Sequence, residues 1–85
     1  MPFSIELSRI AIKHLSKIPS LEKKRISLRL EEISKHPLPK DVKKIQGDDN
    51  LYRIRSGNYR ILYRIYHRQV VVLIVDIDHC KNIYR

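Results

Sequence analysis

The chain has 85 residues and a mass of 10.2 kDa, which is enough for one hydrophobic core and too little for two. Its 42% hydrophobic and 32% charged residues exclude a disordered tail, and its low glycine and proline content excludes a low-complexity chain. The net charge of +9, with a sequence pI of about 10.0, is typical of domains that bind a polyanion. We therefore treat residues 1–85 as a single basic domain.

Nucleic acid is the polyanion that this composition favours, ahead of an acidic protein or a membrane surface. The longest apolar run, residues 70–75, is far shorter than the about 20 residues of a membrane span. A lone cysteine, Cys80, cannot build a disulfide framework and fits a reducing compartment. Residues 1–6 lack the basic and apolar segments of a signal peptide. We expect a cytoplasmic protein with no membrane partner.

A short strand and two helices are predicted in the first half of the chain. Apolar and polar residues alternate over residues 3–7, which is the period of a half-buried strand. From Ser8, a candidate N-cap, the period becomes helical, and Pro19 ends this first helix. Ser20 can cap a second helix over about residues 21–35. The expected core stripes are Ile10, Ala11, Leu15 and Ile18 in the first helix and Ile26, Leu30 and Ile33 in the second.

The second half of the chain is predicted to form strands. Residues 40–50 are polar and rich in turn formers, so we expect a loop there. Strands are predicted over residues 51–55, 59–66 and 70–77, with the last inside the sheet, and short turns make such strands antiparallel neighbours. The expected fold is α+β: an N-terminal strand, a two-helix hairpin and a three-stranded antiparallel meander, with the helices packed on one face of the sheet.

The other face of this sheet is predicted to be basic. Strand alternation turns the isoleucines of these strands toward the helices, and it turns four arginines outward: Arg53, Arg55, Arg60 and Arg64. No acidic residue occurs between positions 51 and 75. A face that is merely solvated would mix charge signs, because like charges on adjacent strands repel. The cluster therefore predicts an anion site, and the planar guanidinium fork suits phosphate.

The sequence resembles a known family at this point. The block LYRIRSGNYRILYRI, the β-branched strand after it and the terminal H-x-K-x-I-Y-R are similar to the RelE/ParE superfamily of toxins. The resemblance spans essentially the whole chain, including the helical segment AIKHLSKIPSLEKKRI around its Pro turn. It implies a toxin of a type II toxin–antitoxin system. RelE-like members are ribosome-dependent endoribonucleases that cut mRNA in the A site, whereas ParE-like members poison DNA gyrase and lack the nuclease residues.

The resemblance to the RelE-like branch also implies site residues and partners. The implied partners are a RelB-like antitoxin and the 70S ribosome with mRNA, and a heterotetramer with the antitoxin is one assembly that it allows. Cys80 and Lys81 stand where RelE-like members commonly carry arginines, and Lys81 keeps the charge without the fork. The implied catalytic residues are Arg53, Arg55, Arg60, Lys81 and Tyr84.

RNA cleavage by these residues would need neither a cofactor nor a metal. The ribose 2′-hydroxyl attacks the adjacent phosphate, which requires a base, an acid and cations that stabilise the added charge. Arginines stay protonated and act as clamps, while neighbouring cations favour tyrosinate at Tyr84 and so make it a candidate proton carrier. Lys81 is a candidate acid or second clamp. Two alternatives remain open, namely a gyrase inhibitor without nuclease activity and a non-catalytic RNA-binding module.

Other polar residues have a weaker signal. The lysines at 40–44 either contact phosphates of RNA or lie in a solvated loop, and His14 is expected at the surface. Residues 76–80 contain two aspartates, a histidine and a cysteine, but without a second Cys/His pair we expect no metal site. The candidate RNA-binding residues are Lys40, Lys43, Lys44, Arg64 and His79.

Overall fold

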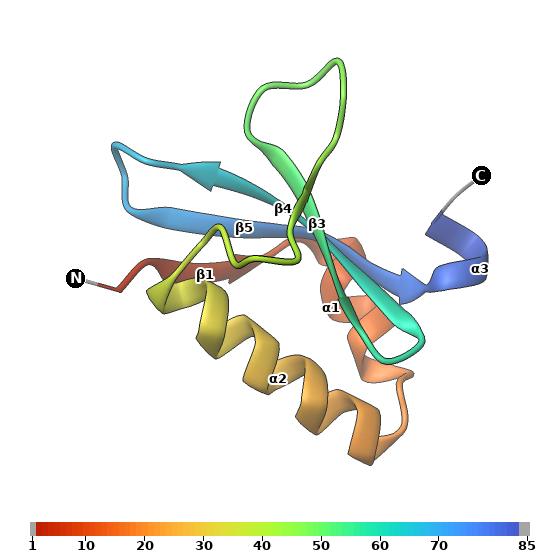
Figure 1. Cartoon of the computed structure of the whole chain (residues 1–85). Helices are drawn as coiled ribbons and strands as arrows, with labels where there is room; N and C mark the ends of the chain where they lie inside the picture. The colour runs from red at the N-terminus through yellow and green to blue at the C-terminus, as the bar shows by residue number, and fades with distance from the viewer. Residues whose placement is uncertain (1, 84–85) are drawn as a thin grey trace.

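The computed structural model describes residues 2–83 as a five-stranded mixed sheet with two helices packed against it (Figure 1). The strands lie in the order β1-β5-β4-β3-β2. In chain order the elements are β1 (Ser4–Leu7), α1 (Arg9–Ser16), α2 (Ser20–Lys35), β2 (Lys43–Lys44), β3 (Leu51–Ser56), β4 (Tyr59–Tyr66), β5 (Val71–His79) and α3 (Cys80–Ile83).

The two predicted helices are confirmed, but their caps differ. The Ser8 hydroxyl accepts a hydrogen bond from the Ala11 backbone N–H at 3.1 Å and donates one to the Val75 carbonyl at 2.7 Å, so it caps α1 and ties it to β5. The prediction that Ser20 caps α2 is wrong, because Pro19 occupies the cap position without a side-chain cap bond. Its fixed φ, here −56°, already sets the direction in which the chain starts the helix.

The core lies between the helices and one face of the sheet. Ala11, Ile26 and Ile33 are fully buried from the helix side, and they meet inward-facing residues of β3, β4 and β5 in one cluster. The expected core position of Ile10 is wrong, because this side chain is 44% exposed. The short helix α1 packs mainly along β5, so its Ala11 side alone reaches the centre of the core.

The predicted meander β3-β4-β5 is antiparallel as expected, and the structure adds a strand at each edge of it. β1 pairs in parallel with β5, from Ser4 opposite Val71 to Leu7 opposite Ile74, which makes the sheet mixed. The prediction of a plain loop over residues 40–50 is wrong at β2, where Lys43 and Lys44 pair with β3. Backbone pairing at a sheet edge needs no apolar pattern, so no residue pattern signals β2.

One long-range contact fixes the segment after α2 to this frame. The hydroxyl of Tyr63 on β4 donates to the Pro37 carbonyl at 2.6 Å, which holds the segment after α2 against the sheet. Burial raises the pKa of Tyr63, so this group stays protonated and able to donate.

Within residues 2–83 the structure contains no helix that is both long and apolar enough to span a membrane.

Candidate functional site

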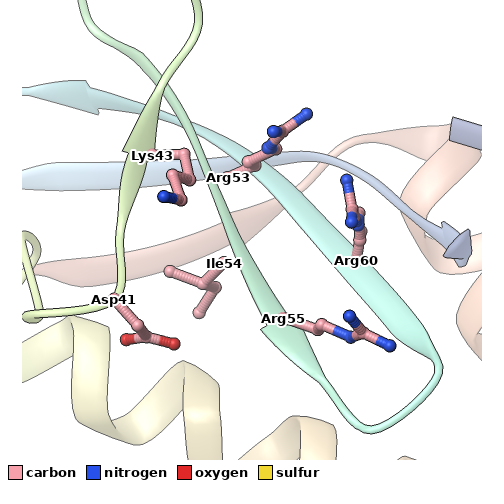
Figure 2. A pocket seen from close by; sticks show the side chains of 6 residues that line it. All are labelled: Asp41, Lys43, Arg53, Ile54, Arg55 and Arg60. Atoms are coloured by element: carbon pink, nitrogen blue, oxygen red, sulfur yellow. The ribbon is translucent and has the colours of Figure 1, made fainter. Parts of the chain in front are cut away.

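A basic pocket of about 280 Å³ opens at the edge of β3, where β2 stops covering it (Figure 2). β2 pairs with β3 at two positions only, so the edge of β3 beyond Arg53 is left open to this pocket. Three of the four arginines that the sequence placed on one face meet here, together with a lysine from β2. The lining residues are Asp41, Lys43, Arg53, Ile54, Arg55 and Arg60.

Strand register brings like charges next to each other around this pocket. Lys43 on β2 is the cross-strand partner of Arg53, and Arg55 is the partner of Arg60 across the β3–β4 ladder. Directly paired residues have Cβ atoms roughly 4.5–5.5 Å apart, and residues of like charge that are paired in this way destabilise a sheet. An anionic ligand such as a phosphate would offset this repulsion. The two pairs are the strongest physical sign of a binding site in the structure.

A local contact fixes where the guanidinium group of Arg55 lies. Arg55 Nε donates to the Gly57 carbonyl at 2.8 Å, which holds the side chain against the tight turn between β3 and β4. Gly57 adopts a φ of +59°, a conformation that glycine takes without steric cost. Arg60 lies opposite Asp78 of β5 in the other ladder, so one flank of the cationic cluster has an acidic neighbour. Arg55 is therefore held at the turn, and Arg60 has an acidic cross-strand neighbour on β5.

Asp41 is a lining residue that sequence reasoning missed. Its carboxylate accepts a hydrogen bond from Arg29 Nη2 of α2 at 2.8 Å, and Arg29 Nη1 also donates to Glu32 at 2.6 Å. In Figure 2 Asp41 lies on the far side of Ile54 from Arg55 and Arg60. The acid is thus engaged by the helix and leaves the arginine side of the pocket basic. No sequence signal places it there, because the chain first has to return from α2 across the sheet edge.

The fourth predicted arginine, Arg64, lies apart from this pocket and has a carboxylate partner. Its Nη1 and Nη2 donate to the two carboxylate oxygens of Asp48 at 2.7 and 2.8 Å. These hydrogen bonds lower the pKa of Asp48 and raise that of Arg64. The expectation that Arg64 contacts RNA stays a prediction, and the structure shows that its fork is already engaged within the chain.

The predicted lysines separate in the structure. Lys40 is exposed in the segment before β2 and does not line the pocket. Lys44 pairs with Tyr52, so it lies on the opposite side of β2 from Lys43. Only Lys43 of this group reaches the pocket lining.

The residues predicted near the C-terminus begin beside the β3–β4 turn. The Cys80 backbone N–H donates to the Asn58 carbonyl at 2.8 Å, which fixes the start of α3 to that turn. His79 packs its ring edge-on against Tyr59, with centroids 5.5 Å apart, and its Nδ1 lies 3.3 Å from the Lys81 backbone nitrogen, which donates to it. Lys81 is exposed. Tyr84, the candidate proton carrier, lies outside the described residues.

A second polar cluster lies between α1 and β5, and the sequence did not reveal it. His14 Nδ1 is 2.7 Å from Asp76 Oδ1 and 3.9 Å from Asp78 Oδ2. The expectation that His14 lies at the surface holds in part, because its side chain is 26% exposed and its ring nitrogen contacts the Asp76 carboxylate. The partners are 62 positions apart in the chain, so only the folded structure brings them together.

Comparisons with known proteins identify the family of this chain. The sequence matches the family described as the ParE toxin of type II toxin–antitoxin system, parDE, over residues 5–84. Toxin RelE3 of Methanocaldococcus jannaschii is 39% identical over 77 residues, which cover 86% of this chain and 85% of that protein. The mRNA interferase toxin RelE of Escherichia coli (strain K12) is 25% identical over 79 residues, which cover 91% of this chain and 82% of that toxin.

A solved structure extends the comparison to the fold. The RelB–RelE antitoxin–toxin complex from Methanococcus jannaschii contains a chain that matches with a TM-score of 0.76 at 32% identity. The match covers 93% of this chain and 94% of that one. The chain therefore belongs to the RelE/ParE superfamily of toxins from type II toxin–antitoxin systems, and its named relatives are RelE toxins.

Proposed function

We propose that this RelE-family toxin cleaves mRNA in the A site of the ribosome and thereby inhibits translation. The observation that carries the proposal is the pair of like-charged neighbours around the pocket, Lys43 with Arg53 and Arg55 with Arg60. Such pairs cost stability in the free protein, and the phosphate backbone of RNA would relieve that cost. The name of the Escherichia coli relative, an mRNA interferase toxin, supports the same reading.

The proposed reaction uses the RNA's own 2′-hydroxyl as nucleophile. The 2′-oxygen attacks the adjacent phosphorus and the bond to the 5′-oxygen breaks, which leaves a 2′,3′-cyclic phosphate and a 5′-hydroxyl. Arg53, Arg55 and Arg60 hold the phosphate and stabilise the charge that develops on it. In this scheme they supply the positive charge that a metal ion supplies in other nucleases, so the proposed reaction needs no metal.

The two proton transfers need other groups, because arginine does not release its proton near neutral pH. Tyr84 would take the proton from the 2′-hydroxyl, and Lys81 would give one to the leaving 5′-oxygen. Lys81 lies on α3, whose start is fixed to the β3–β4 turn beside Arg55.

The ribosome would supply the orientation that this open pocket lacks. Holding the reacting groups in line can account for a large part of a rate enhancement, and a small cationic pocket cannot do so alone. Lys40, Lys44 and His79 would contact phosphates of RNA around the site, beside Lys43 in the pocket. A RelB-like antitoxin would hold the toxin inactive, as a heterotetramer in one arrangement, and both partners place the activity in the cytoplasm. The structural neighbour bound to RelB supports this partner.

Primer extension on a defined mRNA programmed onto ribosomes tests the proposal. Wild-type protein should produce new 3′ ends at the A-site codon, and a lane with free mRNA should show none. Arg60→Ala should abolish these ends. Arg68→Ala is the matched control, since it removes the same charge from the exposed turn at the other end of β4 and should cleave normally. A folded, antitoxin-free protein that cleaves nothing would refute the nuclease assignment.

Gyrase inhibition is a second candidate, and the description of the matching family as ParE favours it. A gyrase supercoiling assay on the same preparation separates the two. Inhibition of supercoiling without mRNA cleavage would assign the chain to the ParE-like branch. If the protein binds RNA but neither cleaves mRNA nor inhibits gyrase, it is a non-catalytic RNA-binding module.

A further inference from the structure

Three metal-ligating side chains from two elements meet at the contact between α1 and the end of β5. The His14 imidazole and the carboxylates of Asp76 and Asp78 each offer one ligand atom, and these atoms all lie within 4.8 Å of one another. The side chains are 26%, 27% and 28% exposed, so they are partly buried at the seam and still open to water and ions. This cluster shares no residue with the lining of the basic pocket.

The backbone holds these ligands in place before any ion arrives. Asp76 and Asp78 are two residues apart on β5, and the α1 segment that carries His14 is tied to the same strand at its start. The Ser8 backbone N–H donates to the Ile74 carbonyl at 2.9 Å, and its hydroxyl donates to the Val75 carbonyl at 2.7 Å. A helix fixed at its first turn places His14 reproducibly over the strand.

A simple ion pair explains only part of this arrangement. His14 Nδ1 can take part in one hydrogen bond, and its partner at 2.7 Å is Asp76 Oδ1. Asp78 Oδ2 faces the same nitrogen at 3.9 Å, beyond hydrogen-bond distance, while Asp78 Oδ1 accepts the His79 backbone N–H at 2.8 Å. A second carboxylate oxygen thus lies near this nitrogen without a hydrogen bond to it.

The set of donor atoms indicates the class of ion. One imidazole nitrogen with two carboxylate oxygens suits a divalent transition cation such as zinc, which binds nitrogen and oxygen ligands at roughly 2.0–2.2 Å. Three protein ligands leave at least one position for water. Magnesium and calcium prefer oxygen ligands alone and usually more of them, so this set disfavours both.

We propose that His14, Asp76 and Asp78 form a binding site for a divalent transition cation. The ion would replace the proton between His14 and Asp76 and draw in the facing oxygen of Asp78. It would join α1 to β5 through three bonds in place of one hydrogen bond. Because Asp78 is the cross-strand partner of Arg60, the site also lies one residue pair away from the basic pocket.

Isothermal titration of the full chain with zinc chloride, in a buffer that does not chelate metals, tests the proposal. Wild-type protein should bind one zinc ion per chain with a saturable isotherm, and magnesium chloride should give no such isotherm. His14→Ala and Asp76→Asn should each weaken zinc binding by at least about tenfold. His36→Ala is the matched control, because it removes an exposed histidine away from the cluster and should leave binding unchanged.

A second variant and a spectroscopic probe exclude the nearest competing ligands. Cys80→Ser should bind zinc as the wild type does, and the cobalt-loaded protein should lack a thiolate-to-metal charge-transfer band. Circular dichroism checks that each variant is folded, and if His14→Ala does not fold, the isosteric Asp76→Asn and Asp78→Asn variants decide. Absence of zinc binding by the folded wild type would overturn the proposal. Loss of binding in Cys80→Ser, or unchanged binding in folded His14 and aspartate variants, would overturn it equally.

Discussion

The two ends of β4 carry the same residue type on the same face and differ in what surrounds it. At one end, Arg60 has Arg55 beside it on β3 and lines the basic pocket. At the other end, Arg64 donates to both carboxylate oxygens of Asp48. One end therefore gathers positive charge around a cavity, and the other end pairs its charge within the chain.

The segment before β3 produces this difference. The Ile65 backbone N–H donates to the Asn50 carbonyl at 3.1 Å, and this contact brings the loop with Asp48 onto the Arg64 end. At the other end, Asp41 from the loop after α2 lines the pocket with Arg55, but its carboxylate accepts a hydrogen bond from Arg29 of α2. Two arginines with equal sequence signals can thus have unequal surroundings, because a neighbouring loop supplies Arg64 with a carboxylate while Arg60 lines the pocket.

The largest expected effect separates the two arginines by activity. Arg60→Ala should lower the rate of ribosome-dependent mRNA cleavage by about 10²–10³-fold, since it removes a donor that stabilises the transition-state charge. Arg64→Ala should lower it by less than about tenfold, because that guanidinium is engaged by Asp48. Primer-extension time courses measure both rates. Equal losses in the two variants would remove the distinction between the ends.

The next effect concerns the support beneath the basic end. Ile54 is 2% exposed under the pocket, and Ile54→Ala should lower the free energy of unfolding by about 3 kcal/mol through lost burial and a new cavity. Ile12→Ala is the matched control, because that isoleucine is 56% exposed and should change stability by less than about 0.5 kcal/mol. Urea denaturation gives both values, and a similar small loss for both would show that the pocket floor is not part of the core.

A gain in stability is expected beside the far end of β4. Val70, in the turn between β4 and β5, has a φ of +58°, which is unfavourable for a β-branched residue. Val70→Asn should raise the free energy of unfolding by about 1 kcal/mol, since asparagine tolerates this conformation. Val71→Asn, on the adjacent residue in extended β5, should give no gain. A loss of stability in Val70→Asn would mean that the valine side chain contributes more than its backbone costs.

The smallest effect concerns the ion pair at the Arg64 end. The hydrogen bonds from Arg64 lower the pKa of Asp48 below its unfolded value of about 3.9, so the pair stabilises the fold above that pH. This contribution is lost as the pH falls through the folded pKa. Asp48→Asn should therefore be slightly less stable than wild type near neutral pH and equal to it in strong acid. Urea midpoints at the two pH values measure this, and a difference that persists in acid would contradict it.

Much of the fold followed from local patterns. The alternation over residues 51–66 predicted β3 and β4 and the faces of their side chains, and burial confirms that Ile54, Ile61 and Ile65 point inward. The helical period predicted both helices. Neither pattern encodes which strands pair at the sheet edges, so the parallel position of β1 and the two-residue β2 were not predictable from it.

The candidate site likewise has features that a local pattern predicts and features that it does not. Strand alternation alone predicts that Arg53, Arg55 and Arg60 share a face, because side chains alternate on a strand whatever the strand's neighbours are. The folded chain is needed to show that Lys43 joins them and that Arg64 does not, since both outcomes depend on where the loop between α2 and β3 returns. The same holds for His14 with Asp76 and Asp78, because contacts between distant residues are set by packing and leave no local period.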